Sequence, residues 1–228
     1  MRRFGGLVAV GALLLAARGF AVWEAYDPLR IGAAFQPERV SLTAHDVRRK
    51  RDIPLRVYLP AATNAAPVVL FSHGLGGSCE NNPYLGNHWA ARGYVAVFLQ
   101  HAGSDSAVWK GAPANERMGS LRDAADGKNF MLRMEDVSAV LDQLAEWNAE
   151  KGQVLAGRLD LSRVGMSGHS FGAVTTQAVS GQTFLLGGKS FRDARIKAAV
   201  AFSPSAPRLG NAEKAFGKVE IPWLLMTG

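Results

Sequence analysis

Cysteine is almost absent from the 228-residue sequence, which has only Cys79. One cysteine cannot form an internal disulfide, so a disulfide scaffold is excluded. Internal repeats and low-complexity tracts are also lacking. Because 48% of the residues are hydrophobic, a chain of this length can bury one sizeable core. A disordered or collagen-like protein is therefore excluded as well.

Acidic residues are outnumbered, since 19 Asp and Glu stand against 26 Lys and Arg, which gives a formal net charge of +7. Most of this excess lies before residue 52, where nine basic and four acidic residues differ by +5. The remaining sequence is nearly balanced. Neither a basic motif nor interleaved aromatic residues accompany the charge, so we expect no nucleic-acid partner.

The uncharged run near the N-terminus is too short for a relaxed helix to cross about 30 Å of hydrocarbon. Two arginines precede this run, which covers residues 4–17, and the pattern is typical of a signal peptide. We therefore predict a signal peptide or N-terminal anchor over residues 1–21 and an exported protein, periplasmic or secreted. The alternative is a membrane-anchored protein that associates with the membrane through residues 4–17.

The folded domain is expected over residues 39–228, after a linker at residues 22–38. Residues 67–72 and 94–99 are continuous apolar runs, which are typical of strands buried on both faces of a sheet. A short helix is predicted between them at residues 87–92. Because strands alternate with helices, we predict an α/β domain with a mainly parallel sheet. The other predicted elements are a hairpin (40–44 and 53–59), strands at 163–166, 197–202 and 222–227, and a helix at 171–180.

The stretch at residues 103–130 lacks any hydrophobic period, and we predict a long surface loop there, a candidate lid or wall of the binding site. Residues 131–147 follow with apolar side chains at helical spacing. This pattern predicts an amphipathic helix that covers the sheet, with Asp136 among its polar positions.

Residues 168–172 read Gly-His-Ser-Phe-Gly, which is a G-x-S-x-G motif. A predicted strand precedes the motif and a predicted helix follows it. This is the setting of a nucleophile elbow, in which a strained turn projects the serine hydroxyl above the sheet. We interpret Ser170 as the candidate nucleophile; a turn without chemistry is the alternative.

Residues 72–77 read Ser-His-Gly-Leu-Gly-Gly and directly follow a predicted buried strand. Acyl transfer needs backbone N–H donors aimed at the developing oxyanion, and a glycine-rich turn at the end of a central strand lets the main chain approach a substrate. The alternative is that these glycines only shape a turn. The Lys-Ser/Thr pair of a phosphate-binding loop is absent.

The sequence resembles the α/β-hydrolase superfamily in these two motifs and in the order of elements between residues 53 and 227. Within the superfamily it resembles the branch that contains platelet-activating-factor acetylhydrolases and dienelactone-hydrolase-like proteins. The resemblance implies an α/β-hydrolase fold with a mostly parallel central sheet flanked by helices. It also implies a serine ester hydrolase that forms an acyl-enzyme on Ser170, with the N–H groups of Leu75 and Phe171 as the oxyanion hole. The implied substrates are small-molecule or lipid esters with short acyl or acetyl groups. The motif residues expected to support this geometry are His73, Gly74, Gly76, Gly168, His169 and Gly172.

The sequence departs from the family pattern because no histidine follows Ser170. In this fold the triad follows the chain order Ser, then Asp or Glu, then His, and a serine without an imidazole is not activated. Ser203 stands where the acetylhydrolases carry an aspartate. We therefore predict that the triad acid and histidine are not present in this chain. The histidines are His45, His73, His88, His101 and His169, and the acidic residues after Ser170 are Asp193, Glu213 and Glu220.

The sequence ends at Gly228, directly after a predicted strand. We expect the last strand and helices of the fold to be missing, so that the chain is part of a longer hydrolase or a truncated gene product, and inactive by itself. A catalytically dead binding or interaction protein on the same fold is the alternative, and a natural stop codon after Gly228 favours it. Amide cleavage by the same serine is a third hypothesis.

Two further residues are interpreted as structural. His101 ends a predicted buried strand, and as a general base it would break the family order, so a hydrogen-bonded structural histidine is favoured. Cys79 has no elbow around it and is interpreted as a loop thiol. No His, Cys or carboxylate cluster shows metal-ligand spacing, so we expect neither metal nor cofactor.

Overall fold

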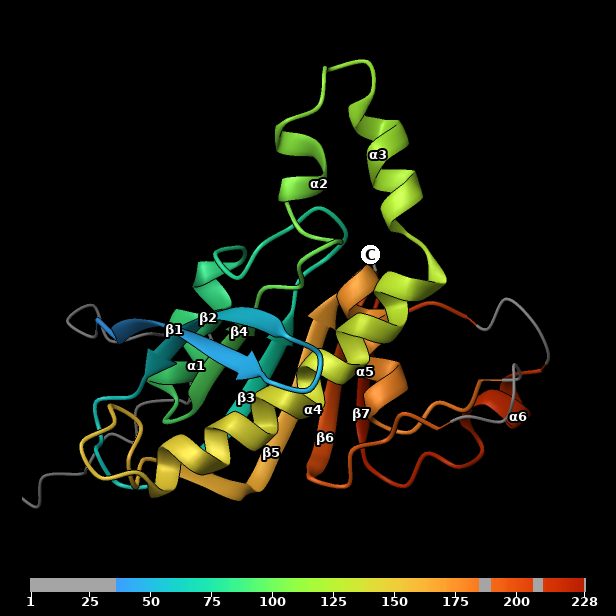
Figure 1. Ribbon diagram of the computed structural model, residues 1–228. Coiled ribbons are helices and arrows are strands. Elements are labelled where there is room, and N and C mark those ends of the chain that lie inside the picture. Colours follow the sequence, from blue (N-terminus) through green and yellow to red (C-terminus); the bar gives the residue numbers. More distant parts are fainter. Residues whose placement is uncertain (1–35, 185–189, 207–210, 228) are drawn as a thin grey trace, which may run out of the picture. The chain divides into compact units, whose positions relative to one another are not determined.

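A seven-stranded sheet forms the centre of the fold (Figure 1). The structure is a computed structural model, and it describes residues 36–184, 190–206 and 211–227. The strands are β1 (Glu38–Asp46), β2 (Arg51–Leu59), β3 (Ala66–Ser72), β4 (Val95–Leu99), β5 (Leu159–His169), β6 (Ile196–Phe202) and β7 (Trp223–Met226).

The strand order is β1-β2-β4-β3-β5-β6-β7. All neighbouring pairs from β4 to β7 are parallel, whereas β2 pairs antiparallel with both β1 and β4. The predicted α/β fold with a mostly parallel sheet is therefore confirmed. The predicted signal or anchor segment at residues 1–21, and all of the predicted linker before residue 36, lie outside the described residues.

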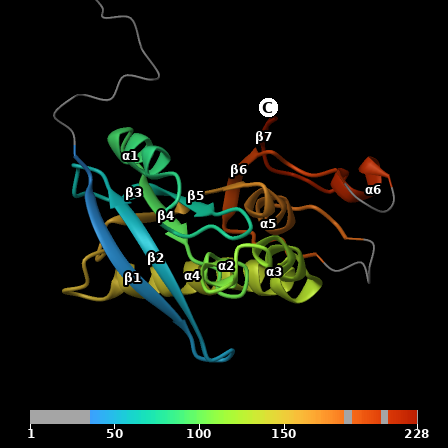
Figure 2. The same ribbon diagram turned by 90° about the horizontal axis from the view of Figure 1, so that it is seen from above.

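Helices cover both faces of the sheet (Figure 2). One helix, α1, packs on one face through Ala90, Leu85 and Trp89. The helices α4 and α5 share a hydrophobic cluster on the other face. The helices are α1 (Pro83–Ala91), α2 (Ala107–Lys110), α3 (Arg117–Ala124), α4 (Gly127–Ala149), α5 (Phe171–Val179) and α6 (Ala212–Phe216).

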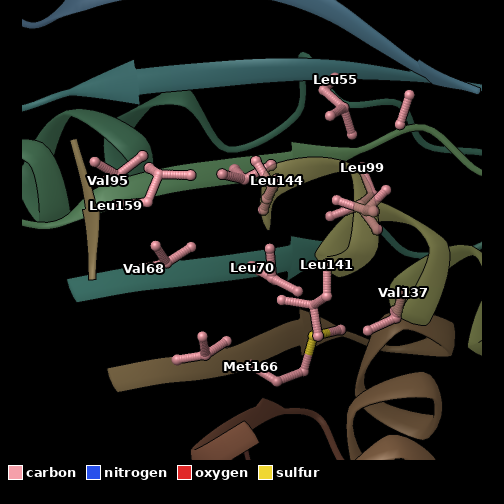
Figure 3. Close-up of a cluster of buried hydrophobic side chains, with 14 of the residues drawn as sticks. Leu55, Val68, Leu70, Val95, Leu99, Val137, Leu141, Leu144, Leu159 and Met166 are labelled. Atoms are coloured by element: carbon pink, nitrogen blue, oxygen red, sulfur yellow. The ribbon is translucent and has the colours of Figure 1, made fainter. Parts of the chain in front are cut away.

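The main core lies between the sheet and α4, where Leu141 and Leu144 point toward Leu70 and Leu99 (Figure 3). All five residues of β4 are buried, and β3 is buried along most of its length. β4 is therefore buried on both faces, as its continuous apolar sequence predicts, whereas Pro67 and Val69 on one face of β3 are partly exposed.

The long surface loop predicted over residues 103–130 contains two helices, α2 and α3, and the start of α4, which the sequence did not predict. These helices stand together above the sheet (Figure 1). They are short and lack an apolar stripe, but Trp109 and Leu121 pack over Gly76 and anchor them. Tertiary packing thus stabilises two helices whose sequences show no hydrophobic periodicity.

Helix boundaries also differ from the predictions. Helix α4 begins at Gly127 rather than 131, because the Asp126 carboxylate accepts a hydrogen bond from the Asn129 N–H and caps the helix. Helix α1 begins at Pro83, since proline is favoured in the first helical turn. The short helix α6, capped by Asn211, was not predicted.

At one edge of the sheet, β7 pairs only with β6 in the described part of the chain. Its side chains Leu224, Leu225 and Met226 are about half exposed, at 56%, 52% and 48%. Among the described residues, no helix is both long and apolar enough to cross a membrane.

Candidate active site

Ser170 occupies the turn between β5 and α5, with φ of 54° and ψ of −114°. A positive φ strains a non-glycine residue, and such strain concentrates at functional sites. The Ser170 N–H donates a hydrogen bond of 2.9 Å to the Phe202 carbonyl at the end of β6, which holds the turn. The residue is exposed, and its hydroxyl has no hydrogen-bond partner among the described residues. This is the geometry of a nucleophile elbow.

The two motif glycines allow α5 to start directly against the end of β3. A Cβ on Gly172 would overlap the carbonyl oxygen of Ser72, and a Cβ on Gly168 would overlap the Gly172 carbonyl. In both cases the obstacle is backbone, which cannot rotate away. The glycines of the motif are therefore required by the close approach of the elbow to the neighbouring strand.

The glycine-rich loop after β3 lies beside the elbow. A Cβ on Gly74 would stand 3.6 Å from the Cβ of Ser170 and 3.4 Å from Nδ1 of His169. Gly76 has φ of 71°, and its N–H donates a hydrogen bond of 2.9 Å to the carbonyl of Ser104. These contacts bring the two sequence motifs together at the carboxyl ends of β3 and β5.

Two backbone N–H groups at this junction, those of Leu75 and Phe171, have no hydrogen-bond partner among the described residues. Phe171 is the first residue of α5, and the first N–H groups of a helix have no partner within it. The helix dipole adds partial positive charge at the same end. The two N–H groups that the sequence predicts as oxyanion donors thus make no hydrogen bond within the described part of the chain.

Solved structures of two hydrolases resemble this fold. No family model matches the chain. A ferulic acid esterase of Streptomyces cinnamoneus aligns with a TM-score of 0.56 at 20% identity, over 86% of this chain and 66% of the esterase. A dienelactone hydrolase of Anabaena variabilis aligns with a TM-score of 0.53 at 18% identity, over 85% of this chain and 74% of the hydrolase. The chain has the α/β-hydrolase fold.

The sequence is also similar to a curated protein, a platelet-activating factor acetylhydrolase of Cavia porcellus. The two are 29% identical over 132 residues, which are 48% of this chain and 30% of the relative. The match thus spans less than a third of the length of that relative. The resemblance predicted from the motifs, to acetylhydrolases and dienelactone hydrolases of the α/β-hydrolase superfamily, is confirmed.

Within this α/β-hydrolase fold, His73 holds the glycine-rich loop from inside. Its side chain is buried, its Nδ1–H donates a hydrogen bond of 2.6 Å to the Gly74 carbonyl, and its Nε2 accepts one of 3.1 Å from the N–H of His101. Burial, together with the nearby His101 and the charge of Arg133, lowers the pKa of His73 to about 2. The neutral ring therefore connects the backbone of His101, just after β4, to the glycine-rich loop.

A chain of buried polar groups runs beneath the loop. The Arg133 guanidinium donates to the Ser72 hydroxyl at 3.0 Å, and that hydroxyl donates to Nε2 of His101 at 2.8 Å. His101 in turn donates from Nδ1 to the Asp136 carboxylate at 3.0 Å. These hydrogen bonds run from a serine hydroxyl to a histidine and from the histidine to an aspartate, which is the order in a Ser-His-Asp triad. Because none of these residues is exposed, they cannot reach a substrate, and His101 is a hydrogen-bonded structural histidine.

The prediction that Asp136 lies on the polar face of its helix is wrong, because this carboxylate is fully buried. Besides His101, Arg51 binds it at 2.7 and 3.0 Å and Arg49 binds it at 2.9 Å. These partners lower the pKa of Asp136 far below that of a free aspartate, despite the opposing effect of burial. The buried charge is stable here only because four N–H donors from three side chains surround it.

The remaining histidines lie in three different places. His45 is exposed on the β1–β2 hairpin, where its ring contacts Asp52 at 2.7 Å, and His88 lies in α1. His169 is exposed beside Ser170 and packs against Gly74. None of the three forms a hydrogen bond with the Ser170 hydroxyl.

The three acidic residues after Ser170 lie outside the elbow. Asp193 and Glu220 form ion pairs with Arg195 and Arg192, and Glu213 lies in the first turn of α6. Ser203 follows β6 with φ of 56°. An arrangement of Ser170 with an acid and a histidine is therefore not seen among the described residues.

Sequence reasoning missed Arg133 and Asp136, which organise the interior of the site. Their positions carry a signal, since each lies four residues before a core valine of α4, Val137 and Val140. Residues four apart share one face of a helix. A charged residue on the same helix face as buried apolar residues therefore indicates a buried polar network.

Acid is expected to destabilise the protein because two buried histidines, His73 and His101, stay neutral in the folded state. Burial, with Arg133 second, lowers the pKa of His101 to about 4 from 6.5, and the pKa of His73 is lowered as well. Between pH 6.5 and 4 the unfolded chain therefore binds protons that the folded protein does not. The free energy of unfolding should fall as pH falls, by up to about 1.4 kcal/mol per pH unit for each histidine.

Urea unfolding at pH 7 and pH 5 measures this loss. Equal midpoints at the two pH values would contradict the assignment of neutral buried rings. The variant His101→Asn keeps a donor toward Asp136 and should be less stable at pH 7, but its stability should depend less on pH in this window. The carboxylates act in the same direction only at lower pH, near and below 3.8.

Proposed function

We propose that the chain carries the nucleophile and oxyanion hole of a serine carboxylic-ester hydrolase. The observation that carries this proposal is the exposed, strained Ser170 next to the unpartnered N–H groups of Leu75 and Phe171. Backbone strain at a non-glycine residue concentrates at functional sites, which favours this proposal over a turn without chemistry. The sequence and fold relatives named as an acetylhydrolase, an esterase and a hydrolase support the same reaction class.

In the proposed reaction, Oγ of Ser170 bonds to the carbonyl carbon of the ester while its proton passes to a general base. The carbonyl oxygen becomes an oxyanion, which accepts hydrogen bonds from the N–H groups of Leu75 and Phe171. The C–O bond to the alcohol then breaks, the alcohol leaves with a proton, and an acyl-enzyme remains on Ser170. Water hydrolyses this ester and restores the hydroxyl.

The general base is assigned to no described residue. His73 and His101 are buried with both ring nitrogens engaged, and His45 and His88 lie on other elements. His73, Gly74, Gly76, Gly168, His169 and Gly172 act in this proposal through the shape of the loop and elbow.

The proposed substrates are small-molecule or lipid esters with a short acyl or acetyl group. The name of the sequence relative, an acetylhydrolase, supports this class. Trp109 and Leu121 pack over Gly76, so α2 and α3 stand as a wall beside the proposed oxyanion hole. We further propose an exported protein, on the N-terminal sequence pattern alone, with a membrane anchor as the alternative.

Replacing Ser170 with alanine is expected to lower the hydrolysis of p-nitrophenyl acetate by the full-length protein by a factor of roughly 10³ or more. The matched control is Ser203→Ala, since Ser203 is a second exposed serine with positive φ at the end of the neighbouring strand. This control should retain the activity. Equal rates in the wild type and the Ser170 variant would refute the proposal.

A further inference from the structure

Arg133 is a fully buried arginine at the junction of four chain segments. Its Nε donates to the Thr175 hydroxyl at 3.0 Å and its Nη1 to the Ser104 hydroxyl at 2.9 Å. Its Nη2 donates to the Ser72 hydroxyl and to the carbonyl oxygen of His73. One rigid guanidinium therefore connects α4 with β3, the glycine-rich loop, the loop after β4, and α5.

These contacts fix the loop on both sides of Leu75. On one side Arg133 binds the His73 carbonyl directly. On the other side it binds Ser104, whose carbonyl accepts the N–H of Gly76 at 2.9 Å. The peptide unit that carries the Leu75 N–H lies between these two anchors.

The same side chain fixes Phe171. The guanidinium lies 4.7 Å from the centre of the Phe171 ring, in a cation–π contact. The Thr175 hydroxyl, which accepts from Arg133, donates a hydrogen bond of 3.1 Å to the Phe171 carbonyl. Phe171 is therefore held at its ring and at its carbonyl.

We propose that Arg133 is a positioning residue that sets the separation and direction of the Leu75 and Phe171 N–H groups. The inference rests on the proposed function, in which these groups bind the oxyanion. Arg133 does not touch the substrate in this account. It acts by holding the loop and the start of α5 at a fixed spacing, which an oxyanion hole needs before the reaction begins.

The test compares two adjacent buried threonines of α5. Thr175 and Thr176 are both fully buried, and each hydroxyl donates to the carbonyl four residues earlier. Only Thr175 also accepts from Arg133. Each of the variants Thr175→Val and Thr176→Val removes one hydrogen bond to a helix carbonyl, but only Thr175→Val removes the link from the guanidinium to the Phe171 carbonyl.

The first readout is the hydrolysis of p-nitrophenyl acetate by the full-length protein. Because a displaced donor weakens transition-state binding more than substrate binding, Thr175→Val should lower kcat roughly tenfold with little change in KM. Thr176→Val should keep kcat within about twofold. Arg133→Met should lower kcat by about 100-fold, and Arg133→Lys should recover part of that loss.

The second readout is independent of activity. Hydrogen exchange at the Gly76 and Gly77 amides, which donate to Ser104 and Gly74, reports the order of the loop. Exchange at these amides should be faster in Thr175→Val than in Thr176→Val at equal global stability.

Equal kcat values and equal exchange in the two threonine variants would overturn the positioning role. If the wild type shows no Ser170-dependent turnover, the proposed function fails instead. The exchange comparison then decides whether Arg133 orders the loop: faster exchange in Thr175→Val supports this role, and equal exchange overturns it.

Discussion

Replacing Gly172 with alanine should lower the free energy of unfolding by about 3 kcal/mol or more. The added Cβ would overlap the carbonyl of Ser72 and lie 2.9 Å from the carbonyl oxygen of His73. Both obstacles are backbone at the end of β3, so relief requires α5 to move away from the sheet. Urea unfolding at pH 7 measures the change.

The control for this variant is Gly119→Ala in α3. Gly119 is also helical, but it is exposed and a Cβ there meets no atom within 4 Å. Alanine is the better helix former, so this variant should be stabilised by up to about 1 kcal/mol. A Gly172→Ala protein as stable as the wild type would show that the elbow does not need the close approach described above.

Replacing Asp136 with asparagine should destabilise the protein by about 3–5 kcal/mol, because it removes the fully buried carboxylate on which three side chains converge. Arg49, Arg51 and His101 all converge on this carboxylate. An amide of the same shape offers one oxygen in place of two and places an NH₂ group among the N–H donors. The change in urea unfolding gives the magnitude.

Asp142→Asn is the matched control on the same helix. Asp142 also binds an arginine, Arg195 at 2.6 Å, but its side chain is 60% exposed. Exposed ion pairs contribute about 1 kcal/mol or less, so this variant should be close to the wild type. Similar losses in the two variants would contradict the claim that burial makes the Asp136 cluster different.

The elements of the site that are contiguous in the sequence lie close to where the sequence predicted them. The strand, turn and helix around Ser170 are contiguous in the chain, and so are β3 and the glycine-rich loop. A continuous apolar run predicts a buried strand, and glycine marks a turn where backbone approaches backbone. The assignment of chemical roles to Ser170, Leu75 and Phe171 stays a prediction.

The interior of the site could not be predicted in the same way. Charged residues are almost never fully buried unless they are paired, so Asp136 was placed on the polar face of its helix. Its burial depends on Arg49 and Arg51, which are more than 80 residues away in the sequence. The helices α2 and α3 likewise depend on packing against Gly76 rather than on their own sequence.

The most direct test of the central claim is to identify the residue that reacts with a serine-directed fluorophosphonate. The full-length protein is incubated with the probe and digested, and the modified peptide is sequenced by mass spectrometry. We expect one adduct, on Ser170, which is absent from the Ser170→Ala variant and present in Ser203→Ala. An unmodified Ser170, under conditions in which a known serine hydrolase reacts, would contradict it.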